Sequence, residues 1–121
     1  MRKKLFAILA AVLPVAAMAQ FDSAPAFPGA EGHGRYVTGG RGGKVVHVTN
    51  LNDNGPGSLR AAVKGNEKKI VVFDVAGVIA LDKDLKIGQN TTIMGQTAPA
   101  PGITVRYYTI KPESNNIIRY I

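Results

Sequence analysis

The stretch FPGAEGHGRYVTGGRGGKVVHVTNLNDNGPGSLRAAV, residues 27–63, holds most of the glycine of the chain and decides how the rest is organised. Glycine enters backbone conformations that are closed to other residues, so this density predicts specified turns and not a helix. The run also invites comparison with phosphate-binding loops. Val45 stands where the P-loop needs Ser or Thr, and Val37 stands where the dinucleotide fingerprint needs its third glycine. Neither nucleotide-binding motif is met.

One strand and one short helix are predicted inside this stretch. Residues 44–51 are rich in β-branched side chains, and the Asn, Gly and Pro residues at 52–57 follow them with strong turn chemistry. Ser58 can cap a helix over 59–64, because apolar residues in it fall at i, i+3 and i+4. A helix this short, with one narrow apolar face, is expected to cover a neighbouring core.

Residues 1–19 have the pattern of a secretory signal peptide. A basic start at residues 2–4 precedes an apolar run over 5–17, and the small residues that follow predict cleavage before Gln20. The apolar run is too short to span a bilayer as an anchor. We therefore expect a secreted or periplasmic protein with no membrane attachment after cleavage, in which residues 20–26 form a loosely held lead-in.

The composition is that of one small exported domain. The 121 residues suffice for a single core, and the absence of cysteine excludes a disulfide-stapled fold and any thiolate metal site. The chain is basic, and it stays modestly basic when the signal is removed. Outside the cytoplasm an acidic polysaccharide is a better partner for such a chain than nucleic acid, which an aromatic share of 7% also disfavours.

Beyond residue 69 the sequence changes to a series of short strands. We predict them at 70–75, 78–81, 85–87, 91–94, 103–105, 108–110 and 116–121. Similar residues recur at an offset in the low twenties, as in the pairs Val72 with Ile93, Ile93 with Ile117, Gly77 with Gly102, and Ile87 with Ile110. Such a period, carrying about three strands, is typical of a parallel β-solenoid. An antiparallel sandwich has similar strand spacing, so these residues alone leave both folds open.

The solenoid alternative assigns a side to each residue of the first strand of this series. Val71, Phe73 and Val75 share one parity and would point into the apolar column, with Asp74 outside. The predicted helix would then cover the open end of the column.

Two asparagines fall at corresponding turns of the predicted coils. The side-chain amides of Asn90 and Asn115 could stack and form hydrogen bonds along the solenoid axis. Asparagine also suits turns for local reasons alone, so this pattern does not decide between the folds.

No catalytic or metal-binding constellation is visible in the sequence. His33 and His47 lie on different segments with no partner at ligand spacing, and we expect a turn residue and an outward strand residue. Asp82 and Asp84 begin a pattern that does not continue as a calcium loop, and no serine, histidine and acid trio is suggested.

Seven ordered blocks of sequence nevertheless resemble one family. The blocks are FPGAEGxGRY at 27–36, TGGRGG at 38–43, VTNLND at 48–53, GPGSLRAAV at 55–63, IVVFDVxG at 70–77, IxGQTAP at 93–99 and IIRYI at 117–121. Together they resemble the N-terminal third of bacterial secreted pectate lyases, which are polysaccharide lyases of family 1 type. The resemblance implies an all-β fold, a right-handed parallel β-helix whose N-terminal coils are closed by a short capping helix. At His33 many members of the family carry an aromatic residue.

The resemblance also implies an activity, the cleavage of polygalacturonate by calcium-assisted β-elimination. In such lyases carboxylates hold Ca²⁺ against the substrate uronate and an arginine removes the proton next to it. Those residues lie on later coils, which here would follow Ile121, and Arg119 is not at the position of the family's basic arginine. We therefore assign no catalytic, cofactor-binding or metal-binding residue to this chain.

Residues 27–121 are accordingly expected to be the N-terminal part of a pectate lyase-like domain, truncated at its C-terminal end. We expect this part to be inactive and only marginally stable by itself, and the full-length enzyme to be a monomer acting on pectin. The alternative is a noncatalytic β-solenoid that serves in binding or adhesion.

Overall fold

The computed structural model describes residues 24–121, which belong to two compact units that divide between Tyr36 and Val37. The predicted signal peptide and most of the lead-in lie outside the described residues. The described part of the first unit consists of turns, in which the Ala26 amide donates to the Arg35 carbonyl at 2.8 Å. The expected domain boundaries at 19, 26 and 27 stay predictions.

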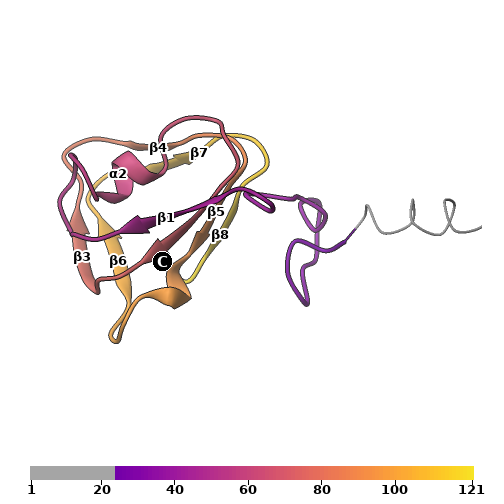
Figure 1. Ribbon diagram of the computed structural model, residues 1–121, viewed down its shortest axis with the longest axis horizontal. Coiled ribbons are helices and arrows are strands. Elements are labelled where there is room, and N and C mark those ends of the chain that lie inside the picture. The colour runs from indigo at the N-terminus through magenta and orange to yellow at the C-terminus, as the bar shows by residue number, and fades with distance from the viewer. Residues whose placement is uncertain (1–23) are drawn as a thin grey trace, which may run out of the picture. The chain divides into compact units, whose positions relative to one another are not determined.

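The second unit, residues 37–121, winds as a parallel β-helix (Figure 1). Its elements follow in the order β1 (Lys44–Val48), α2 (Leu59–Ala62), β2 (Lys69–Phe73), β3 (Gly77–Ala80), β4 (Leu85–Ile87), β5 (Thr91–Met94), the 3-10 helix η2 (Gly95–Thr97), β6 (Ile103–Arg106), β7 (Ile110–Pro112) and β8 (Ile117–Arg119). The sheets have the orders β1-β2-β5-β8, β3-β6 and β4-β7, and every pair is parallel. Consecutive strands from β2 onward thus lie in different sheets, which confirms the solenoid and excludes the antiparallel sandwich.

The register of the coils differs from the one that the sequence spacing indicated. The paired residues are Val71 with Ile93, Ile93 with Ile118, Gly77 with Ile103, and Leu85 with Ile110. The recurrences that indicated the period, Val72 with Ile93, Ile93 with Ile117, Gly77 with Gly102, and Ile87 with Ile110, therefore lie one or two positions away from the paired residues. A slip of one residue moves every side chain to the other face, so burial selects the register and residue type alone does not.

Several strand boundaries also differ from expectation, and two of these differences have a backbone cause. β7 begins at Ile110 and not at 108, because Tyr107 has a φ of 88° and forms a turn with the exposed Tyr108. β8 ends at Arg119, since the next residue, Tyr120, has a φ of 59° that no strand residue adopts. Side chains in the left-handed region break these strands where apolar composition favoured longer ones.

Inward-facing aliphatic side chains form the core. Val71 and Phe73 are buried and Asp74 is exposed, as predicted. Val75 is only half-buried, because β2 ends at Phe73 and the strict alternation of sides ends with it. The expectation that Val75 points fully into the column is therefore wrong.

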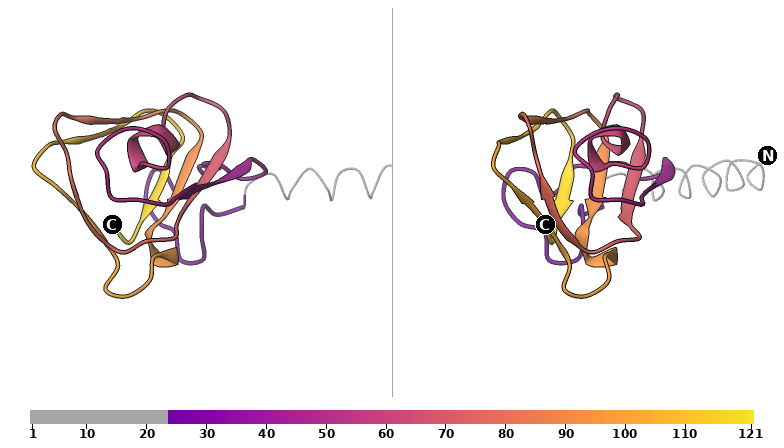
Figure 2. Two further views of the ribbon diagram at one scale, coloured as in Figure 1. Left: turned by 60° about the vertical axis from the view of Figure 1, so that its left-hand side comes forward. Right: turned by 90° about the vertical axis from the view of Figure 1, so that its left-hand side faces the viewer.

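Helix α2 covers one end of this column, and Figure 2 (left) shows it within the outline of the coil. Leu59, Ala62 and Val63 are buried in the same apolar cluster as β1, β2 and β4 residues. Ser58 caps the helix, since its Oγ accepts from the Ala61 amide at 3.2 Å. A four-residue helix is not stable in isolation, so its packing on the column maintains it.

The two predicted turn asparagines do stack along the axis. Nδ2 of Asn115 donates to Oδ1 of Asn90 at 2.8 Å, and Nδ2 of Asn90 donates to the Asn66 carbonyl at 3.0 Å. Both also have left-handed backbones, with φ of 58° at Asn90 and 60° at Asn115. The axial role and the turn role that the sequence left open are therefore both realised.

Residues 38–43, which we call the glycine strap, lie close against the backbone of later coils. A Cβ on Gly40 would lie 1.7 Å from the Lys69 carbonyl oxygen, and one on Gly39 would lie 2.3 Å from Oγ1 of Thr92. The Gly40 amide donates to the same Thr92 Oγ1 at 2.9 Å. We expected these glycines to form turns that lead into the first coil, whereas Gly39, Gly40 and Gly43 permit a close approach that any side chain would prevent.

Candidate functional site

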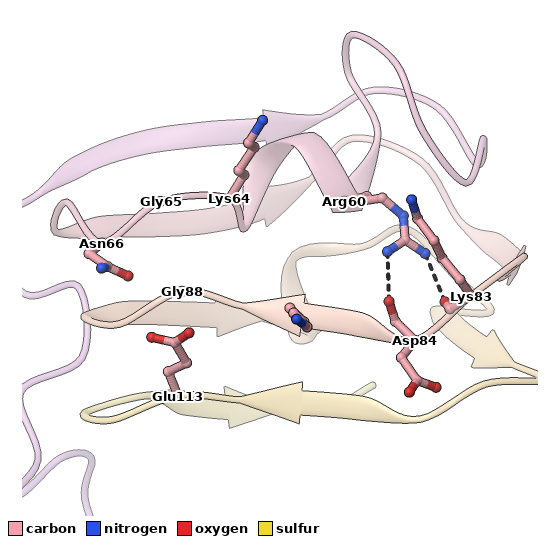
Figure 3. A pocket seen from close by; sticks show the side chains of 9 residues that line it. Arg60, Lys64, Gly65, Asn66, Lys83, Asp84, Gly88 and Glu113 are labelled. Atoms are coloured by element: carbon pink, nitrogen blue, oxygen red, sulfur yellow. Dashed lines mark hydrogen bonds between the residues drawn. The ribbon is translucent and has the colours of Figure 1, made fainter.

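An open cleft of about 530 Å³ lies beside the capping helix (Figure 3). Its lining comes from α2 and the turn after it, from β4 and its two flanking turns, and from the turn after β7. The lining residues are Arg60, Lys64, Gly65, Asn66, Lys83, Asp84, Lys86, Gly88 and Glu113. Four of the nine are cations, and we call this feature the basic cleft.

Arg60 anchors one end of the basic cleft and does not present a free charge. Its Nη2 donates to Oδ1 of Asp53 at 2.8 Å and to the Lys83 carbonyl at 2.9 Å, and its Nη1 donates to the Asp84 carbonyl at 2.8 Å. The hydrogen bond from Arg60 is the main cause that lowers the pKa of the Asp53 carboxyl below its usual value. The guanidinium thus ties the helix to two turns of the coil and has its charge offset.

Asp84 is likewise neutralised within the protein. Its Oδ2 forms an ion pair with the Lys111 ammonium, and its Oδ1 accepts from the Thr109 amide at 3.2 Å. The hydrogen bond from Lys111 is the main cause that lowers the pKa of Asp84. This carboxylate is therefore ionised at neutral pH and already has its counter-charge.

The three remaining cations of the lining are exposed. The ammonium groups of Lys64, Lys83 and Lys86 form no hydrogen bond or ion pair with any residue of 24–121. Glu113 supplies one exposed carboxylate at the opposite wall. The lining consequently carries more unpaired positive than negative charge.

A buried lysine supports the wall of the cleft from inside. Lys69 is 1% exposed, and its Nζ donates to the carbonyls of Lys64 at 2.6 Å and Gly65 at 2.8 Å. Loss of hydration on burial lowers its pKa. The sequence analysis missed this residue, although Lys69 shares the inward parity of Val71 and Phe73 and could have been found from it.

The titratable residues singled out from the sequence are not brought together. His33 is an exposed turn residue in the first unit, and His47 points outward from β1, both as predicted. Nδ1 of His47 lies 2.8 Å from Oδ1 of Asp74 on the outer face of the coil. Asp82 is exposed and separate from the Asp84 pair. Among residues 24–121 no three His, Cys, Asp or Glu side chains are grouped so that they could hold a metal ion.

Arg119 lies at the other end of the described coils. Its guanidinium carbon is 5.1 Å from the centre of the Tyr120 ring, a cation–π contact at the surface. Across residues 24–121 no helix is both long enough and apolar enough to cross a membrane.

Comparison with known proteins finds relatives for most of the chain, although no family model matches it. It is 50% identical to a probable pectate lyase C of Aspergillus fumigatus and 51% identical to one of Emericella nidulans, each over 98 residues that make up 79% of this chain and 23% of the relative. It is 35% identical over 82 residues to a pectin lyase of Pectobacterium carotovorum, which covers 68% of this chain and 24% of that protein. The chain thus spans less than a quarter of the length of these curated relatives.

Proposed function

The chain is a homologue of the pectate lyases, and we propose that it forms the capped first coils of a secreted enzyme that cleaves polygalacturonate by β-elimination. The observation that carries this proposal is 50% sequence identity to a probable pectate lyase over 98 residues, in a chain that folds as the parallel β-helix expected of such an enzyme. The net basic charge supports an acidic polysaccharide as the substrate.

Within this proposal, the described residues have a structural role. β-Elimination needs a base beside the proton next to the uronate carboxylate, together with a group that stabilises the resulting negative charge. Calcium is proposed for the second task by resemblance, but residues 24–121 lack a carboxylate cluster that fits it. We therefore derive no catalytic step here, and we place the calcium ligands and the base on further coils.

The fold suits that division of labour. α2 closes one end of the apolar column, and β8 lies at the edge of the four-stranded sheet among the described residues. A sheet edge carries backbone donors and acceptors that can pair with another strand in parallel. Further coils can therefore stack on β8, whereas α2 prevents stacking at the other end. No observation in the structure or among the relatives favours the noncatalytic adhesion alternative.

The test compares two proteins, the product of the complete gene and residues 20–121 alone. Each is incubated with polygalacturonate and Ca²⁺, and the ultraviolet absorbance of the unsaturated uronide product is followed. The complete product should be active and the short chain inactive. Turnover by the short chain would refute the assignment of catalysis to further coils, and an inactive complete product would refute the lyase itself.

Export is tested separately on the protein recovered from outside the cytoplasm. We expect sequencing of its N-terminus to begin at Gln20, because the signal ends with small residues just before it. An intact N-terminus at Met1 would exclude cleavage and with it the secreted form.

A further inference from the structure

We propose that the basic cleft binds a stretch of uronate-bearing saccharide chain, as a holding site that takes no part in bond cleavage. The inference rests on the proposed function only for the choice of ligand, since the cleft itself is defined by the described residues.

The balance of charge in the cleft favours an anionic ligand. Arg60 is offset by Asp53, and Asp84 is offset by Lys111. This leaves the three lysine ammonium groups of the lining against the single carboxylate of Glu113. An anion entering here meets cations that need not first break an ion pair with the protein, so it gains their attraction without that cost.

The unpaired cations stand on two sides of the cleft. Lys64 follows α2, with its side chain directed away from Gly88, and Lys83 lies in the turn before β4 (Figure 3). Lys86 lies within β4. Lys86 is also in register with Lys111 on the next coil, and like charges directly opposite each other repel. Lys111 forms an ion pair with Asp84, whereas Lys86 forms none, so a bound carboxylate would give Lys86 a direct counter-charge.

A neutral donor beside these cations suits a sugar. Oδ1 of Asn66 accepts from the Gln89 amide at 3.0 Å, which fixes the side chain. Its Nδ2 forms no hydrogen bond within the described residues and can donate to a hydroxyl or carboxylate oxygen of a saccharide.

Nucleic acid fits the cleft less well than a uronate chain. None of the nine lining residues is aromatic, so bases have no ring to stack on. The one guanidinium, that of Arg60, is already bonded to protein oxygens on all three of its nitrogens and is not free to clamp a phosphate. Spaced carboxylates on a hydroxyl-rich chain match ammonium groups and an amide better.

The experiment uses the protein expressed from the complete gene, with long oligogalacturonate as the probe and no Ca²⁺, so that binding is measured without cleavage. The double variant K64Q/K86Q removes two cations from the cleft. The control K44Q/K68Q removes two exposed lysines that do not line it, of which Lys44 forms an exposed ion pair with Glu67. The variant E113Q removes the one unpaired carboxylate of the lining.

Losing two exposed charge contacts, each worth up to about 1 kcal/mol, should weaken binding about tenfold in K64Q/K86Q. The control should change the dissociation constant by less than about twofold, and E113Q should tighten binding. Added salt should reduce the difference between K64Q/K86Q and the unaltered protein. Equal losses in both double variants, or weaker binding in E113Q, would overturn the proposal. Duplex DNA bound as tightly as the oligogalacturonate at the same salt would overturn it too.

Kinetics separate this inference from the proposed function. With Ca²⁺ present, K64Q/K86Q should raise KM for polygalacturonate and leave its kcat unchanged. For a trimer, both kcat and KM should stay unchanged, because the cleft holds chain remote from the reacting bond. A fall in kcat on the trimer would contradict a holding role. If the complete protein shows no turnover but K64Q/K86Q still weakens binding, the proposed lyase fails and the cleft stands. If turnover is normal and binding is unaltered in K64Q/K86Q, the cleft alone fails.

Discussion

Asn115 offers the sharpest test of how the coils are held together, because its side chain joins two coils and the glycine strap. Its Nδ2 donates to Asn90 Oδ1 at 2.8 Å and to Thr38 Oγ1 at 2.9 Å, and its Oδ1 accepts from the amides of Thr38 at 2.9 Å and Gly39 at 3.4 Å. The residue also adopts a φ of 60°. The substitutions N115G and N115A separate the side-chain bonds from the backbone strain.

The expected magnitudes follow from these contacts. Three short hydrogen bonds are lost in either variant, and at about 1 kcal/mol or less each, since two are exposed, they amount to about 2 kcal/mol. Alanine in the left-handed region costs a further 1 to 2 kcal/mol or so. The greater conformational freedom of glycine in the unfolded state reduces the difference in stability between N115A and N115G by about 0.5 to 1 kcal/mol. We expect losses of about 2 kcal/mol for N115G and about 3 kcal/mol for N115A.

Urea unfolding of the protein expressed from the complete gene measures these losses. Hydrogen exchange at the amides of Thr38 and Gly39 locates them, since both amides should lose protection in each variant. The control Q89A changes an exposed neighbour and should alter stability by less than about 0.5 kcal/mol. An N115A protein as stable as the unaltered one would refute the axial role of the side chain, and N115G less stable than N115A would refute the strain.

Three further outcomes are expected from the same protein. R60M breaks a largely buried ion pair and three bonds to carbonyl oxygens, so hydrogen exchange at the Ala62 amide should show α2 destabilised by about 3 kcal/mol; an unchanged rate would contradict the anchoring role of Arg60. The pKa of Asp53 is lowered in the folded protein, so the stabilising contribution of its carboxylate is complete above the unfolded pKa of about 3.9 and is lost as pH falls through the folded pKa. The urea midpoint of D53N should therefore differ from that of the unaltered protein at about pH 6, and the two midpoints should converge in acid. G40A forces a Cβ against the Lys69 carbonyl and should cost more than about 2 kcal/mol in urea unfolding; a loss no larger than the roughly 1 kcal/mol expected for G42A, where a Cβ meets only backbone strain, would count against the strap.

Local chemistry was enough to place most elements. The β-branched runs, the Ser58 cap and the turn asparagines were predicted because each depends on residues within a few positions of it. The choice between solenoid and sandwich was different, since strand spacing alone left it open and the family resemblance favoured the solenoid. The parallel pairing observed in all three sheets now decides it directly.

Two of the features that sequence reasoning missed join residues that are distant along the chain. The fit of Gly40 against the Lys69 carbonyl and the basic cleft each depend on which coil lies beside which. The buried ammonium of Lys69 is different, since it bonds carbonyls only four and five residues away and strand parity could have indicated it. The exact register of the coils also depends on tertiary packing, because a shift of one residue leaves the composition of a strand unchanged but reverses its faces.

The amino-acid sequence by itself therefore determined the turns of residues 27–63, the capping helix and the relationship to the pectate lyases. Tertiary structure alone decided that Gly39, Gly40 and Gly43 permit close packing against later coils, and that Lys64 and Lys86 line one cleft. The physical reason is range: turn and cap energies arise between near neighbours, whereas close approach and shared charge arise only when distant coils stack.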